Sequence, residues 1–314
     1  MSKQQIVIPC MQCQSEAMKN GEIHQPIFYR CFVEPRKAIS FTCLHGHKNR
    51  VAVQSFPFDL LLSWAFEDFI EGDYAAAMTN FASSLERFLE LSYKILQKGN
   101  GLTVEQINQF WDSLSKSSER QFGAFLGLYV TTIHDLPFSV NQYAKNAKYR
   151  NDAVHGGERN PRQVKTYGQF VIDIIHKIIE NLLSHNLENA KNEIILDQLN
   201  KMGGCTATMC HDFVSWEYSS DAVNDIERKL GELSRKDGLS YAKMAMEANE
   251  TDKCLSVNEK QELVLISHEE FERLNKDKKY RGRRSFEQYC ELASQWKESF
   301  KRFNVIDAKV DVDN

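Results

Sequence analysis

The spacing of apolar residues changes near Pro57, and this change divides the chain into two kinds of sequence. Before Pro57, short runs rich in β-branched and aromatic residues, such as residues 6–8 and 51–53, are typical of strands. After it, apolar residues recur every three to four positions, which is typical of amphipathic helices. We therefore expect a small β module over residues 1–56, followed by a mainly α-helical chain.

The helical part separates into segments with recognisable ends. Asp73 is a predicted N-cap residue, and Asn160 followed by Pro161 is a typical helix start. We expect a helical bundle over residues 57–186, and a mostly helical C-terminal region over 187–314 whose role the sequence does not indicate. The predicted helices cover residues 58–69, 74–97, 103–114, 119–133, 140–155, 161–185, 187–202, 223–234, 239–248, 268–276 and 284–303, with a short strand over 216–218.

Cysteine and histidine residues cluster in the β module. Cys10 and Cys13 form a Cys-x-x-Cys pair, and Cys43 precedes His45 and His47 in a turn that contains glycine. Thiolates and imidazoles are preferred zinc ligands, a structural zinc site takes four of them, and so small a module needs a cross-link. We predict one structural zinc per chain, bound by Cys10, Cys13, Cys43 and His47, with His45 as the alternative fourth ligand. This arrangement resembles a small zinc ribbon.

The remaining cysteines give weaker signals. Cys31 lies in an apolar run, which favours a buried thiol. Cys205 and Cys210 precede His211, but no second pair of ligands stands near them. A second zinc site is therefore not expected.

Polar side chains gather at the predicted end of the helix over residues 140–155. Asn151 and His155 are four residues apart, so they share a helix face, and Arg150 is long enough to reach them. His155 stands in the last turn, where the helix dipole favours the protonated imidazole, and this suits acid–base chemistry. Alternatively, Arg150 and His155 cap the end of the helix.

Arg150, four intervening residues and His155 resemble the R-x4-6-H motif of the HEPN superfamily, and Asn151 fits the common form of that motif. The family consists of small helical bundles, many of which are metal-independent endoribonucleases. The resemblance covers roughly residues 57–186, where one long helix precedes the motif and another follows it. Gly157 stands where some HEPN toxins carry a modified tyrosine, so control by a partner nucleotidyltransferase is not implied.

The resemblance implies a homodimer in which two motifs face each other and form one composite site for an RNA substrate. Cleavage would proceed by attack of the 2′-OH without a catalytic metal. His155 would act in acid–base catalysis, Arg150 would bind the scissile phosphate and Asn151 would position the groups. The analogy suggests a toxin or antiviral defence effector, and leaves a regulatory protein partner open. The alternative is a non-catalytic RNA-binding, nucleotide-binding or protein-interaction module.

Charge and hydropathy limit the classes of function that the chain can have. The 39 Lys and Arg against 43 Asp and Glu give a net charge of −4, which argues against a whole-surface nucleic-acid binder but not against a local site. A basic run over residues 276–284 is either a phosphate contact or a solvated face. No apolar run is long enough to span a bilayer and no secretory signal is present, so we expect a cytoplasmic protein without membrane contact.

Overall fold

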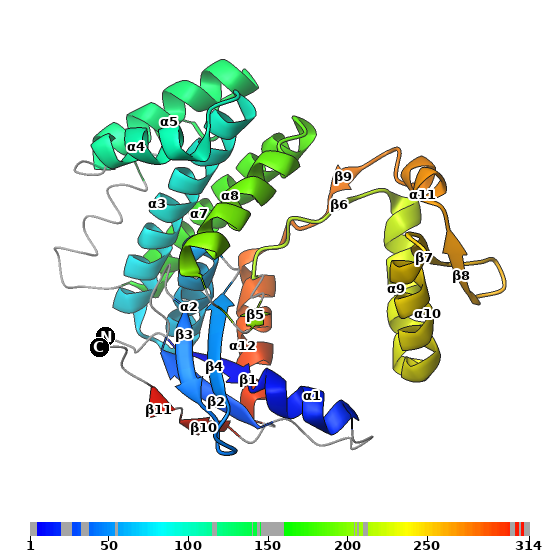
Figure 1. Ribbon diagram of the computed structural model, residues 1–314. Helices are drawn as coiled ribbons and strands as arrows, with labels where there is room; N and C mark the ends of the chain where they lie inside the picture. The colour runs from blue at the N-terminus through cyan, green and yellow to red at the C-terminus, as the bar shows by residue number, and fades with distance from the viewer. Residues whose placement is uncertain are drawn as a thin grey trace. The chain divides into compact units, whose positions relative to one another are not determined.

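The computed structural model describes residues 5–19, 27–32, 38–53, 56–114, 118–139, 141–142, 145, 160–203, 205, 207–209, 213–301, 305–307 and 309–310. These residues form a mainly helical protein with a few short strands, as the sequence predicts (Figure 1). The chain divides into two compact units. The first contains residues 1–214 and 284–314, and the second contains residues 215–283, which are inserted into the first.

The strands of the first unit form two small sheets. In one, the order is β1-β2-β10, with β1 antiparallel and β10 parallel to β2. In the other, the order is β11-β3-β4-β5. The strands are β1 (Gln5–Pro9), β2 (Phe28–Phe32), β3 (Ile39–Thr42), β4 (Lys48–Val53), β5 (Ala207–Met209), β10 (Val305–Asp307) and β11 (Lys309–Val310).

Strands β1 to β4 overlap β-prone runs of the predicted β module, whereas β5, β10 and β11 of this unit were not expected. Residues 305–310 return to the N-terminal strands, and Arg30 of β2 forms an ion pair with Asp307 of β10 at 3.0 Å. The helix α1 (Met11–Lys19), between β1 and β2, was also not predicted. The domain boundary expected at residue 56 remains a prediction, because the residues before and after it belong to the same compact unit.

Alternate residues of the strands build a core beneath the two sheets. Ile8, Tyr29 and Phe41 are buried there, and Leu60 and Trp64 of α2 (Pro57–Glu71) complete it. Cys31 is fully buried in the same core, which confirms its prediction as a buried thiol. The β module therefore packs on the first helix of the helical body.

The helices of the first unit follow the predicted segments closely. Asp73 accepts a hydrogen bond from the Ala76 N–H and caps α3, and Asn160 accepts one from the Arg162 N–H and caps α7. Both predicted helix starts are thus confirmed. The helices are α2 (Pro57–Glu71), α3 (Tyr74–Gly99), α4 (Val104–Leu114), α5 (Ser118–Ile133), α7 (Pro161–Ser184), α8 (Glu188–Met202) and α12 (Phe286–Lys301).

Helix α3 is central in this body, because it packs against α2, α5 and α7 (Figure 1). An aromatic cluster joins α12 to it: the ring of Phe286 lies 4.9 Å from Phe66 and 6.1 Å from Phe81, measured between centroids. Gly168 of α7 faces the same rings. A Cβ on Gly168 would lie 2.6 Å from Phe286 Cε2, so a glycine is needed for this close packing.

The second unit consists of short elements. Its helices are α9 (Asp221–Lys236), α10 (Gly238–Glu250) and α11 (His268–Leu274), and its strands are β6 (Tyr218–Ser219), β7 (Cys254–Val257), β8 (Leu263–Ile266) and β9 (Lys279–Tyr280). Strands β7 and β8 form an antiparallel hairpin that was not predicted. Among the described helices, none is both long and apolar enough to cross a membrane.

Much of the basic run over residues 276–284 is engaged in ion pairs. Lys279 and Arg281 both contact the carboxylate of Asp221, and Lys278 contacts Glu272. The two cations hold the pKa of Asp221 below its usual range, chiefly through the hydrogen bond from Lys279. These contacts give the run a structural role, and an RNA contact by this run remains a prediction.

Candidate metal centre

Cys10 and Cys13 are placed by the junction between β1 and α1. Cys10 directly follows the strand, and its carbonyl oxygen accepts the Gln14 N–H at 3.2 Å, which opens the helix. The Cys13 N–H donates to the Cys10 sulfur. The first turn of α1 therefore brings both thiols to the same side of the chain.

Cys43 and His47 are placed by the turn between β3 and β4. The Cys43 N–H donates to the His47 carbonyl at 3.0 Å, and the Gly46 N–H donates to the Cys43 carbonyl at 2.9 Å. Gly46 has a φ of +82°, a left-handed conformation that glycine adopts without steric cost. The Leu44 N–H donates to the hydroxyl of Tyr29, which fixes the turn on β2.

The two local structures bring Cys10, Cys13, Cys43 and His47 together. One ligand atom from each lies within 4.8 Å of the other three, so this group could bind a metal ion. The Cys13 and Cys43 sulfurs are 3.8 Å apart, and His47 Nδ1 lies 3.8 Å from the Cys10 sulfur and 3.3 Å from that of Cys13. Ligands of a tetrahedral zinc with bonds of about 2.3 Å lie about 3.8 Å apart, so the spacing suits such an ion.

The pKa values of two of the thiols, Cys10 and Cys13, are strongly shifted. Burial raises the pKa of Cys10, but hydrogen bonds from the Cys13 N–H, Asn49 and His47 outweigh it and bring the pKa to about 7. Burial, and the neighbouring thiols of Cys10 and Cys43, raise the pKa of Cys13 to about 12. A bound metal ion would supply positive charge beside Cys10 and Cys13 and so favour their thiolate forms.

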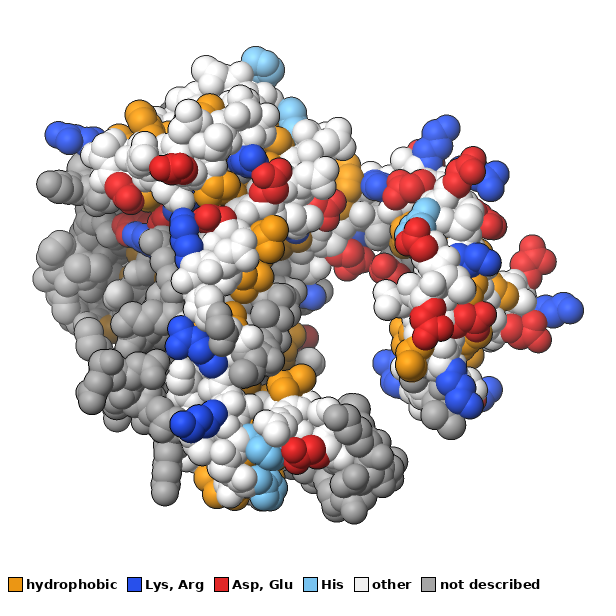
Figure 2. Space-filling view, viewed as in Figure 1, with side chains coloured by type: hydrophobic (Ala, Val, Ile, Leu, Met, Phe, Trp, Pro, Cys, Tyr) orange, Lys and Arg blue, Asp and Glu red, His pale blue; other side chains and the backbone are white. Residues whose placement is uncertain are grey.

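Two further residues hold His47 in place. Its Nε2 lies 3.4 Å from the Glu16 carboxylate of α1, and its carbonyl accepts a hydrogen bond from buried Asn49 at 3.0 Å. A carboxylate on the second nitrogen orients a metal-binding histidine and fixes its tautomer. Histidine and acidic side chains meet at the surface beside α1 and this turn (Figure 2). The contact of Glu16 was not predicted because α1 was not predicted.

His45 lies close to the same group. Its Nδ1 is 3.2 Å from the Cys13 sulfur, but its ring is exposed. His47 is the histidine of the four mutually close ligand atoms. The geometry thus favours His47, and the choice between the two remains open to experiment.

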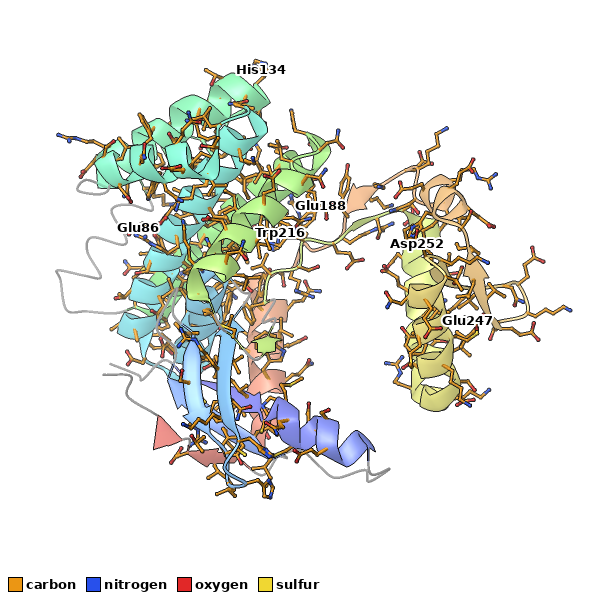
Figure 3. The ribbon with its side chains drawn as sticks, in the orientation of Figure 1. Glu86, His134, Glu188, Trp216, Glu247 and Asp252 are labelled. Carbon is orange, nitrogen blue, oxygen red and sulfur yellow. The ribbon has the colours of Figure 1, made fainter. Side chains whose placement is uncertain are left out.

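The predicted catalytic residues Arg150, Asn151 and His155 lie outside the described residues, as does most of the helix expected over 140–155. The roles of these three residues therefore remain predictions. Glu86, on α3 of the same helical body, is half-buried (Figure 3).

A second group of charged side chains on α3 was not anticipated. The buried carboxylate of Glu90 accepts hydrogen bonds from Arg87 at 2.6 Å and from Lys94 at 2.8 Å. The three residues line a small pocket with Pro57 of α2 and Gln198 of α8. Spacings of three and four residues are typical of exposed helix pairs, so the sequence does not reveal that these charges are buried.

Comparison with protein-family models, with curated proteins and with solved structures finds no match to this chain.

Proposed function

We propose that the chain is a HEPN-like, metal-independent endoribonuclease whose N-terminal β module is held together by a structural zinc ion. The observation that supports the zinc is the mutual proximity of Cys10, Cys13, Cys43 and His47. Three thiolates and one imidazole form a closed set of four ligands, which is typical of a structural rather than a catalytic zinc site. When bound, zinc would join α1 to the β3–β4 turn and stabilise a module with a small core.

The packing of the helical body supports the HEPN-like part of the proposal. The long helices α3 and α7, which correspond to the helices expected on either side of the motif, pack against each other. The motif residues precede Asn160, the N-cap of α7, by only a few positions in the sequence. Such a bundle is the setting that the R-x4-6-H resemblance implies.

The proposed reaction uses the chain's own residues. RNA carries its nucleophile, the 2′-OH, so the protein must supply a base, an acid for the 5′-oxygen and positive charge for the phosphorane. His155 would move the protons, Arg150 would bind the phosphate and Asn151 would position both. Two chains would provide two such sets in a homodimer.

The test of the enzyme is incubation of the purified protein with mixed RNA in a magnesium-free buffer that contains EDTA. The zinc content of the same sample is measured, since loss of zinc would unfold the β module. We expect cleavage by the natural protein and a loss of at least about 100-fold in the His155→Ala and Arg150→Ala variants. His134→Ala is the matched control, because His134 is exposed after α5 and should leave the rate unchanged.

Equal cleavage by the natural protein and the His155→Ala variant would overturn the catalytic assignment. Binding of RNA without cleavage by any form would instead support the non-catalytic alternative. Sedimentation or light scattering tests the homodimer, and a monomer would contradict the composite site.

The test of the zinc is elemental analysis of the purified protein. We expect about one zinc per chain and a large loss in the Cys13→Ser variant. Cys290→Ser is the control, because Cys290 is a half-buried thiol of α12 outside the ligand group. Full zinc in the Cys13→Ser protein would refute the ligand set.

A further inference from the structure

Cys254, His268 and Asp252 form a connected group in the second unit. The Cys254 sulfur lies 3.3 Å from His268 Nδ1, and His268 Nε2 lies 3.3 Å from the Asp252 carboxylate. A thiol, an imidazole and a carboxylate in this order form the nucleophile, base and orienting group of many covalent mechanisms. The N-terminal metal centre does not involve these residues.

The β7–β8 hairpin brings this group together. Its register pairs Cys254, the first residue of β7, with Ile266, the last residue of β8. Ser267 then caps α11, so His268 opens that helix two residues after the paired position. The thiol and the imidazole are thereby fixed by backbone hydrogen bonds on both sides.

Asp252 reaches the imidazole from the other side. It follows α10 and is labelled in Figure 3. Its φ of 51° is left-handed, a conformation that is uncommon for residues other than glycine. Here it ends α10, where the Lys253 N–H donates to the Ala248 carbonyl at 2.9 Å, and this turn places Asp252 beside His268.

We propose that Cys254 is a peroxide-reactive thiol, with His268 as its general base and Asp252 as the residue that positions the base. A carboxylate only accepts hydrogen bonds, so it places the imidazole proton on Nε2. Nδ1 is then free of a proton and faces the Cys254 thiol as an acceptor. The tautomer set by Asp252 is therefore the one that can deprotonate the thiol.

A base is needed because the thiol does not ionise readily by itself. Burial raises the pKa of Cys254, and the carboxylates of Asp252 and Glu272 raise it further. The side chain of Glu272 also pairs with Lys278 at 3.3 Å. Since the thiolate is the nucleophile, transfer of the proton to His268 would govern the rate.

The reaction with hydrogen peroxide can be written with its atoms balanced. The thiol proton passes to His268 Nδ1 and the sulfur attacks one peroxide oxygen. The O–O bond breaks, and the leaving hydroxide takes the proton back from His268 to form water. Cys254 is oxidised to sulfenic acid and the peroxide is reduced to water.

The exposure of the group favours a small reactant. The side chain of His268 is 61% exposed and that of Asp252 is 97% exposed. Cys254 is itself partly exposed, and hydrogen peroxide needs only access to the sulfur and a proton donor. A modification site is thus better supported than a site for a peptide or a cofactor.

The test treats the full-length protein with hydrogen peroxide and traps sulfenic acid with dimedone, followed by mass spectrometry of each cysteine peptide. We expect Cys254 to be labelled at least about tenfold faster than Cys205, a partly exposed thiol of the first unit. His268→Ala should lower the Cys254 rate at least about tenfold. His185→Ala, which removes an exposed histidine elsewhere, is the matched control.

Asp252→Asn tests the positioning role, since asparagine also tolerates a left-handed backbone. We expect a severalfold lower rate and a shift in the pH dependence of labelling, which a merely structural role would not cause. A rate at Cys254 equal to that at Cys205, or unchanged in a folded His268→Ala protein, would overturn the proposal. Circular dichroism of each variant verifies that the second unit is folded.

Discussion

The carboxylate of Asp59 accepts a hydrogen bond from the backbone N–H of Val214, 155 positions along the chain, at 2.7 Å. Its other oxygen accepts the N–H of Phe213, also at 2.7 Å. Arg284, where the chain rejoins the first unit, donates to the Phe213 carbonyl at 3.2 Å. One buried side chain of α2 thus fixes the point where the second unit begins.

Removal of the Asp59 carboxylate should therefore destabilise the first unit. We expect Asp59→Ala to lower the free energy of unfolding by about 2–4 kcal/mol, because two buried N–H groups lose their acceptors. Asp59→Asn should lower the free energy of unfolding by less, since the amide oxygen of asparagine can still accept one hydrogen bond. Denaturant unfolding measures both, with Glu105→Ala, at an exposed position of α4, as the control. Equal stability of all three variants would contradict the role of Asp59.

Glu67 should make stability depend on pH. Burial, then the charges of Glu71 and Asp68, raise its pKa from 4.5 to about 7 in the folded protein. The folded state therefore binds this proton more tightly than the unfolded state, and stability falls as pH rises between these two values. The full shift corresponds to at most about 3 kcal/mol at 1.36 kcal/mol per pKa unit.

The variant Glu67→Gln should remove this dependence. We expect it to be more stable than the natural protein at pH 8 and to lose most of that advantage at pH 4.5. Urea unfolding at the two pH values measures the difference. A stability difference that is the same at both would show that Glu67 does not titrate in this way.

Replacement of glycine by alanine should have opposite effects on the free energy of unfolding at two positions. At Gly168 a Cβ would lie 2.6–2.9 Å from ring atoms of Phe286 and Phe81, so we expect Gly168→Ala to cost about 1–3 kcal/mol. At Gly127, an exposed position of α5, nothing lies within 4 Å of an added Cβ. Gly127→Ala should therefore stabilise by about 0.5–1 kcal/mol through helix propensity alone. Thermal unfolding distinguishes the two, and a stabilising Gly168→Ala would mean that the rings move aside.

The two histidines of the β3–β4 turn should differ in their effect on zinc. We expect His47→Ala to lose most of the bound zinc, because His47 Nδ1 faces the sulfurs of both Cys10 and Cys13. His45→Ala should retain about one zinc per chain. Elemental analysis of the two purified variants compares them, and the opposite result would make His45 the fourth ligand.

Features governed by neighbouring residues could be predicted from the sequence. Asp73 and Asn160 cap their helices within three residues, so the helix starts follow from local chemistry. The proximity of Cys10, Cys13, Cys43 and His47 could be predicted because few side chains bind zinc and a small β module needs a cross-link.

Features that depend on distant partners could not be predicted. Asp307 is one of several acidic residues near the chain end, and nothing in its neighbourhood indicates that it pairs with Arg30. The burial of Glu90 likewise depends on α2 and α8, which are remote in the sequence from its helix neighbours. Helix α1 has no predicted apolar stripe, so Glu16 was missed with it.

The return of β10 and β11 to the N-terminal sheets has a consequence for synthesis of the protein. Strand β2 acquires one of its two neighbours from residues 305–307, and β3 acquires one of its own from residues 309–310. A ribosome has not yet made those residues when α2 to α8 have already emerged. Completion of the β module therefore waits until residues 305–310 have themselves emerged, and a nascent chain carries unpaired strand edges until then.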